Sequence, residues 1–143
     1  MEHTLQNAPL NILLADDDED EQYFFEIAFK ESPIGTNLNT VYDGVYLMEY
    51  LNQHLESLPD VIFLDINMPR KSGLECLIEI KSNEKLKLIP IVVYSSCDSA
   101  DNIVAYYEHG ACSFLQKGHY TELIQCIQNV LNIGEIIHQP ILS

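Results

Sequence analysis

Residues 61–73 read VIFLDINMPRKSG, and they contain the clearest local signals for secondary structure in the chain. The first of these residues, Val61 to Leu64, are all apolar, as expected of a short strand that is covered on both faces of a parallel sheet. The strand runs into Asp65, and a turn with a proline follows. Ser72 stands three residues before Glu75, which is the spacing of a capping box at a helix start. The stretch therefore predicts a strand, a loop and a helix in succession.

Similar units flank this stretch on both sides. Apolar, strand-like runs lie at Leu10 to Ala15, Leu38 to Val41, Ile89 to Tyr94 and Ser113 to Gln116, and the segments between successive runs are long enough for a helix. Strands that alternate with helices in this way indicate an α/β fold with a parallel sheet. The runs at 38–41 and 113–116 include Asn, Thr, Ser or Gln, whereas the others are nearly continuous in apolar residues. We therefore expect these two strands at the edges of the sheet.

Apolar residues also recur with helical spacing in four of the segments that follow the strands. A helix that packs on a sheet needs an apolar stripe on one side, so these positions predict which side of each helix is buried. They are Tyr23, Phe24, Phe25, Ile27, Ala28 and Phe29; Leu47, Met48 and Leu51; Leu74, Leu77 and Ile78; and Leu123, Ile124, Ile127, Val130 and Leu131.

The charge of the chain excludes two classes of partner. Of its 143 residues, 22 are acidic and 7 are basic, so the formal net charge is -15. Hydrophobic residues make up 47% of the chain, which is enough for the core of one folded domain. Nucleic acids and anionic membranes would repel a surface so poor in Lys and Arg. We therefore expect neither as a direct partner.

The expected location is the cytoplasm. No apolar run approaches the roughly 20 residues that cross a bilayer, and residues 1–9 lack the basic start and apolar core of a signal peptide. The cysteines form no CxxC pair and have no histidine at ligand spacing, so free thiols in a reducing compartment are favoured over disulfides or zinc. They are Cys76, Cys97, Cys112 and Cys126.

Polar side chains follow the strands at the edge where an open parallel sheet places its functional crevice. The strand-end residues are Asp16 and Asp17, Asp65, Ser95 and Ser96, and Lys117. Three carboxylates near one point repel one another and imply a bound cation, and oxygen ligands with several waters favour Mg²⁺. A metal beside a carboxylate and a lysine is typical of phosphoryl transfer. The acids at 18–21 are expected to begin a helix.

Several motifs, in this order and spacing, resemble the receiver domain of two-component response regulators. They are Ile12 to Asp17, Phe63 to Pro69, Gly73-Leu74-Glu75, Ile91 to Ser96, Gly110-Ala111 and Lys117. The resemblance implies a flavodoxin-like fold, in which a doubly wound, five-stranded parallel sheet has the strand order 2-1-3-4-5 and helices on both faces. It covers residues 10–132. Residues 1–9 and 133–143 are then expected to be terminal extensions, without an output domain.

The resemblance also implies roles for the strand-end residues. Asp65 looks like the phosphoacceptor, which receives a phosphoryl group from a histidine kinase or a histidine phosphotransfer protein. Mg²⁺, or Mn²⁺ in its place, is expected to bind the carboxylates of Asp17 and Asp65 and the main-chain carbonyl of Asn67. Asp16 is expected to hold metal-bound water.

The remaining implied roles concern the phosphoryl group and the response to it. Lys117 is expected to pair with the phosphoryl oxygens, and Ser95 to donate a hydrogen bond to one of them. Movement of the Ser95 hydroxyl then leaves space for the aromatic ring of Phe114 to turn inward, which changes the surface formed by the fourth helix, the fifth strand and the fifth helix.

Three neighbours of these residues are expected to modulate the site. Related domains commonly have a proline in a cis bond after the lysine, but Gly118 follows Lys117 here. A cis bond before a non-proline residue costs about 3 kcal/mol, so we expect a trans bond or a strained loop, and the direction of the lysine stays open. Cys97 is expected to border the phosphoryl pocket, and its neighbour Ser96 is expected to lie near the site.

The resemblance favours a stand-alone receiver that acts through contact with an unknown downstream protein and is not an enzyme beyond self-phosphorylation and slow dephosphorylation. One alternative is a pseudo-receiver that does not turn over phosphate, which Gly118 keeps open. Another is an aspartyl-phosphate phosphatase or phosphotransferase, but haloacid-dehalogenase-like enzymes need an aspartate where this chain has Asn67. We expect a monomer or weak homodimer. Of the neighbouring residues Tyr106 and Tyr107, we expect one side chain to lie in the core and the other to be half exposed.

Overall fold

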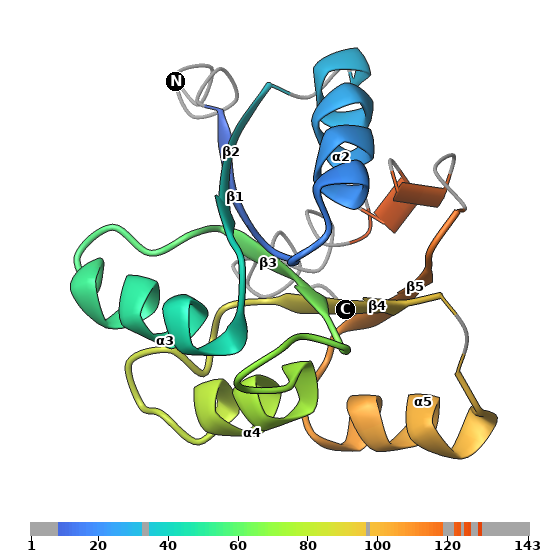
Figure 1. Cartoon of the computed structure of the whole chain (residues 1–143). Helices are drawn as coiled ribbons and strands as arrows, with labels where there is room; N and C mark the ends of the chain where they lie inside the picture. Colours follow the sequence, from blue (N-terminus) through green and yellow to red (C-terminus); the bar gives the residue numbers. More distant parts are fainter. Residues whose placement is uncertain are drawn as a thin grey trace, which may run out of the picture.

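The computed structural model describes residues 9–32, 35–96 and 98–118, together with residues 122, 123, 125, 126 and 129. Strands and helices alternate along this part of the chain (Figure 1). In chain order they are β1 Leu10–Ala15, α2 Glu19–Glu31, β2 Thr36–Val41, α3 Gly44–Gln53, β3 Val61–Asp65, α4 Gly73–Lys81, β4 Ile91–Ser95, α5 Ala100–Glu108 and β5 Ser113–Gln116. Among these residues no helix is long and apolar enough to cross a membrane.

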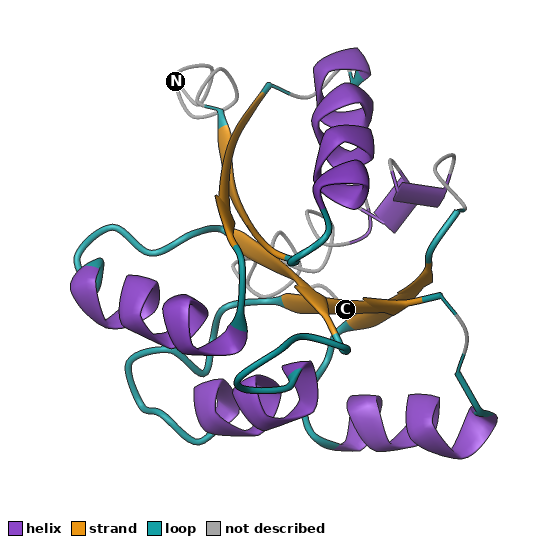
Figure 2. Cartoon of the chain, viewed as in Figure 1, coloured by secondary structure: helices purple, strands orange, loops and turns teal. Residues whose placement is uncertain are grey.

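The strands, orange in Figure 2, form one parallel sheet. Their order is β2-β1-β3-β4-β5, as the resemblance implied. The helices cover both faces, with α2 on one face and α3, α4 and α5 on the other (Figure 1). The two polar runs are the edge strands β2 and β5, so that prediction is confirmed. All residues of β3 and β4 are buried, because helices cover both faces of these two strands.

The predicted strand positions are confirmed with small shifts at their ends. β1 and β5 have the expected bounds, while β2 begins two residues earlier and β3 includes Asp65. β4 begins at Ile91 and not at Ile89, because the N–H of Ile89 donates to the Leu86 carbonyl and closes the preceding turn.

The side chains of the strands alternate between two cores. On β1, Leu13 and Ala15 belong to the core under α3, α4 and α5, whereas Ile12 and Leu14 belong to the core under α2. Leu123 and Cys126 complete the core on the α2 side. Ile124, Ile127, Val130 and Leu131, which were predicted to belong to the last helix, lie outside the described residues.

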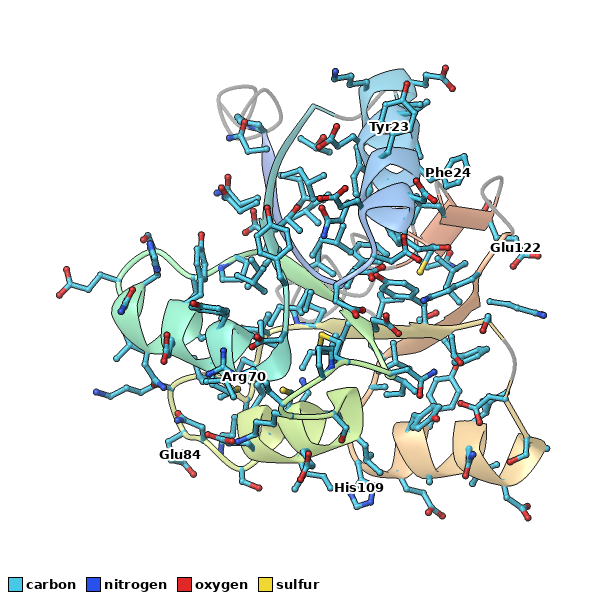
Figure 3. All side chains as sticks on the ribbon, viewed as in Figure 1. Tyr23, Phe24, Arg70, Glu84, His109 and Glu122 are labelled. Carbon is cyan, nitrogen blue, oxygen red and sulfur yellow. The ribbon has the colours of Figure 1, made fainter. Side chains whose placement is uncertain are left out.

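Two predicted apolar stripes are narrower than expected. On α2, Phe25 and Phe29 are buried four residues apart, but Tyr23 and Phe24 are 60% and 41% exposed and project away from the sheet (Figure 3). The prediction was wrong for these two aromatic residues, because only the positions one helical turn apart face the sheet. On α4 the correction is similar, since Ile78 is exposed while Leu77 and Ile80 are buried.

The local signals for helix starts and thiols are confirmed. Asp18 caps α2 with its carboxylate, and Ser72 and Glu75 form the expected capping box at α4. Free thiols are present at Cys76, Cys112 and Cys126, while Cys97 lies outside the described residues. Burial raises the pKa of Cys76 to about 12, so this thiol stays protonated at neutral pH.

Candidate functional site

The strand-end residues meet at the carboxyl edge of the sheet. β1 runs into Asp16 and Asp17, β3 ends at Asp65, and β4 ends at Ser95. Asp16, Asp65 and Ser95 are buried, whereas Asp17 is exposed. The site is therefore a polar cluster that is buried at its base and open to solvent on the side of Asp17.

The acidic side chains are close enough to share one cation. Asp16, Asp17 and Asp65 each offer a carboxylate oxygen, and these oxygens lie within 4.8 Å of one another. The ligand set consists of oxygen atoms only, which suits a hard divalent cation such as Mg²⁺ or Mn²⁺. The chemistry of the donors thus fits the ion that the sequence predicts.

Each oxygen of Asp65 accepts a hydrogen bond. The N–H of Asn67 donates to Oδ1 at 3.0 Å, and the ammonium group of Lys117 donates to Oδ2 at 3.2 Å. Burial raises the pKa of Asp65 to about 6, and the negative charge of Asp16 adds to this effect, although both hydrogen bonds oppose it. The carboxylate is thus fixed in direction but incompletely neutralised by the protein.

Asp16 is held from two sides. The N–H of Asp18 donates to its Oδ1 at 2.8 Å, and the hydroxyl of Tyr94 donates to its Oδ2. Burial raises the pKa of Asp16 in spite of these bonds. The hydroxyl bond is a feature that the sequence reasoning missed. Its only signal is a tyrosine within the otherwise apolar run of β4.

The side chain of Lys117 points into the site. This settles the direction of the lysine, which the sequence left open because Gly118 replaces the usual proline. The ammonium group of Lys117 bonds Asp65 and lies 5.3 Å from the centre of the Tyr94 ring. Burial alone lowers the pKa of Lys117, but the negative charges of Asp65 and Asp16 raise it overall. The peptide bonds of the described residues are all trans, and Gly118 has φ +91, which glycine adopts without steric cost. Of the two outcomes that were expected, a trans bond or a strained loop, the structure shows the trans bond.

The loop after Asp65 is attached to α3 through contacts that the sequence reasoning missed. Arg70 has a positive φ of 68, and its guanidinium donates a hydrogen bond to the Asp43 carboxylate at 3.1 Å. The same group lies 5.3 Å from the centre of the Tyr46 ring. These contacts connect the loop after Asp65 to the first turn of α3.

Phe114 contacts both tyrosines of α5. Its ring stacks on Tyr106 with the ring centres 6.2 Å apart, and its N–H donates to the Tyr107 hydroxyl at 3.0 Å. Tyr106 is buried and its hydroxyl donates to Asp98, whereas Tyr107 is 47% exposed. The expectation of one core tyrosine and one half-exposed tyrosine is confirmed.

Two of the expected modulators are described. Ser96 is exposed, and its carbonyl accepts a hydrogen bond from Gln116 at 3.4 Å. Gly118 borders Lys117, while Cys97 lies outside the described residues.

The family model of the response regulator receiver domain matches residues 12–128. The chain belongs to this family. The receiver domain is 34% identical over 129 residues to the response regulator Rcp1 of Synechocystis, and the match covers 87% of this chain and 88% of Rcp1.

Solved structures agree with this assignment. The phosphorylated cyanobacterial phytochrome response regulator RcpA is 34% identical, with a TM-score of 0.73 over 90% of this receiver domain and 94% of RcpA. The Mn²⁺-bound form of Rcp1 is 32% identical, with a TM-score of 0.73 over 94% and 98% of the two chains. The bacteriophytochrome response regulator RtBRR is 28% identical, with a TM-score of 0.77 over 86% and 78%. The flavodoxin-like fold of a receiver is thus established.

Proposed function

We propose that this receiver domain accepts a phosphoryl group on Asp65 and signals by changing a protein-interaction surface. The observation that carries the proposal is the position of Asp65 between Lys117, at 3.2 Å from one of its oxygens, and the carboxylates of Asp16 and Asp17. The donor is a histidine kinase or a histidine phosphotransfer protein. Because RcpA and RtBRR are described as phytochrome response regulators, a phytochrome-type histidine kinase is the donor class to test first.

Asp17 and Asp65 would hold Mg²⁺ through their carboxylates, Asn67 through its main-chain carbonyl, and Asp16 through metal-bound water. When bound, the ion supplies positive charge between two anionic reactants. The short separation of the three carboxylate oxygens supports this assignment, as does the relative Rcp1, which is described in a Mn²⁺-bound form.

In the reaction that we propose, a carboxylate oxygen of Asp65 attacks phosphorus and the bond from phosphorus to the donor nitrogen breaks. The donor histidine leaves as imidazole, and an acyl phosphate remains on Asp65. Lys117 neutralises charge on the phosphoryl oxygens, and the Ser95 hydroxyl donates a hydrogen bond to one of them. RcpA, which is described as phosphorylated, supports this chemistry.

The output of the proposed reaction is a rearrangement around Phe114. When Ser95 moves toward the phosphoryl group, the Phe114 ring turns into the space behind it and leaves its stack on Tyr106. The exposed surface of α5 and β5 then changes, and the downstream protein binds one of its two forms.

This proposal treats the chain as a signalling domain that acts in the cytoplasm, with residues 10–132 as the receiver unit. The pseudo-receiver alternative is less well supported, because the acidic cluster and Lys117 converge on Asp65. A dehalogenase-like phosphatase would need an acid where Asn67 stands.

Intact-mass spectrometry after incubation with acetyl phosphate and Mg²⁺ tests the proposal. We expect one added phosphoryl group on the wild-type chain and none without Mg²⁺. Asp65→Asn should abolish the adduct, whereas Asp60→Asn, at an exposed aspartate just before β3, should leave it intact. A wild-type chain without an adduct would favour the pseudo-receiver, and an adduct on Asp65→Asn would place the phosphoacceptor elsewhere.

A further inference from the structure

We propose that Tyr94 is a positioning residue, whose hydroxyl orients the Asp16 carboxylate for binding of the divalent cation. The inference rests on the proposed function, since it concerns the metal that assists phosphorylation of Asp65. It assigns a role to a side chain at the base of the site, which is not one of the strand-end residues.

The position of Tyr94 is fixed by packing. It is 1% exposed in the middle of the core under α2, and its ring centre lies 5.0 Å from that of Phe25. Tyr94 on β4 lies opposite Asp65 on β3 in the register of the two strands. A tyrosine held in this way loses little freedom when it forms a hydrogen bond, so its hydroxyl can act as a rigid donor.

The hydroxyl determines how Asp16 presents its oxygens. Oδ1 of Asp16 accepts the N–H of Asp18, and Oδ2 accepts the Tyr94 hydroxyl. These two donors come from a loop and a strand, so together they fix the plane of the carboxylate. One carboxylate oxygen of Asp16 lies within 4.8 Å of an oxygen of Asp17 and of Asp65. A carboxylate oxygen that accepts one hydrogen bond keeps further acceptor capacity for a cation or for metal-bound water. Groups that orient metal-binding side chains in this way commonly change metal affinity by about tenfold or more when they are removed.

The ring of Tyr94 makes a second contact, which can be tested separately. Its centre lies 5.3 Å from the ammonium group of Lys117, at a distance where an aromatic ring attracts a cation. Tyr94→Phe removes only the hydroxyl and keeps the ring beside Phe25 and Lys117. The variant therefore separates the orientation of Asp16 from the packing of the core.

The test is the affinity for Mg²⁺, and separately for Mn²⁺, measured by isothermal titration calorimetry at constant ionic strength. For Tyr94→Phe we expect binding about tenfold weaker than for the wild type. With saturating Mg²⁺, phosphorylation by acetyl phosphate should return to within about twofold of the wild-type rate, because Lys117 and Asp65 are unchanged. A loss of packing alone would lower the stability of the fold without changing the metal affinity.

Tyr106→Phe is the matched control. Tyr106 is another buried tyrosine whose hydroxyl donates to an aspartate, but that aspartate is Asp98, outside the acidic cluster. The affinity of the Tyr106→Phe variant for Mg²⁺ should equal that of the wild type.

A measurement on the wild-type chain covers the case in which Tyr94→Phe fails to fold. With ¹³C-labelled tyrosine, the NMR resonance of the Tyr94 ring should shift as Mg²⁺ is added, while that of Tyr106 should not. Equal or tighter Mg²⁺ binding by Tyr94→Phe, or an unchanged Tyr94 resonance, would overturn the inference alone. A wild-type chain that binds no divalent cation would overturn the proposed function as well.

Discussion

At the residue scale, Asp65 is a buried carboxylate whose negative charge the protein alone does not fully neutralise. The residue is 1% exposed, and among the described residues the one positive charge that pairs with it is that of Lys117. Burial therefore raises its pKa from 3.8 to about 6. The folded chain without metal holds a proton on Asp65 more tightly than the unfolded chain does, so the contribution of this group to stability decreases as the pH rises through that interval.

This pKa predicts how Asp65→Asn changes the stability of the metal-free chain. Asparagine does not titrate, so in EDTA the variant should gain stability relative to the wild type as the pH rises from about 4 to about 6. A shift of this size corresponds to about 2 to 3 kcal/mol. Urea unfolding of both chains across this pH range measures the difference. A difference that does not change with pH would contradict the raised pKa.

At the scale of elements, α4 begins against the backbone of the proposed phosphoacceptor. Ser72 accepts the N–H of Glu75 at 3.2 Å and donates its own N–H to the Glu75 carboxylate at 2.8 Å. Gly73 follows directly, and a Cβ at this position would lie 2.3 Å from the Asp65 carbonyl oxygen. The capping box and the glycine thus bring the start of the helix into contact with the site.

We therefore expect Gly73→Ala to destabilise the fold by about 2 kcal/mol, because the added methyl group meets backbone atoms that cannot move freely. It should also slow phosphorylation, since Asp65 must shift to make room. Gly35→Ala is the control, because a Cβ at Gly35 has no neighbour within 4 Å. Chemical denaturation measures the stability of both variants. Equal free energies of unfolding for the two variants would show that the backbone near Asp65 can move aside without loss of stability.

At the scale of the whole molecule, the net charge of -15 includes a local and a global part. The local part is the cluster of Asp16, Asp17 and Asp65, whose repulsion a bound divalent cation would relieve. The global part is spread over the surface and is screened by any salt. An experiment can separate the two parts, because only the repulsion within the cluster needs a divalent cation to relieve it.

The local part predicts that Mg²⁺ stabilises the folded chain. An ion that binds only the folded state at 100 times its Kd adds about 2.7 kcal/mol to the free energy of unfolding. Thermal unfolding should therefore shift upward with MgCl₂, and by less with NaCl of equal ionic strength. Asp17 is an exposed member of the cluster. For Asp17→Asn, MgCl₂ and NaCl of equal ionic strength should shift the unfolding temperature by the same amount. A Mg²⁺ effect that NaCl fully reproduces would indicate screening alone.

The strand ends could be predicted from the sequence because a buried parallel strand and the polar residue after it are neighbours in the chain. This locates Asp16, Asp65 and Lys117 at one edge without knowledge of any tertiary contact. The contacts of Tyr94 and Arg70 could not be predicted in this way. Their partners, Asp16 and Asp43, are distant in sequence, and only the register of the strands and the path of the loops bring them together. The exposure of Tyr23 depends on how α2 is rotated on the sheet, which apolar content alone does not determine.

The central position of β1 has a consequence for the order in which the chain folds. β1 is synthesised before the other strands of the sheet, but it pairs with β2 on one side and with the later strand β3 on the other, where Ile12 lies opposite Val61. Asp16 and Asp65 therefore meet only after the chain closes this long loop, which is a slow kind of contact to form. A nascent chain that ends before β3 therefore contains Asp16 and Asp17 without the electrostatic repulsion that Asp65 adds to them in the folded domain.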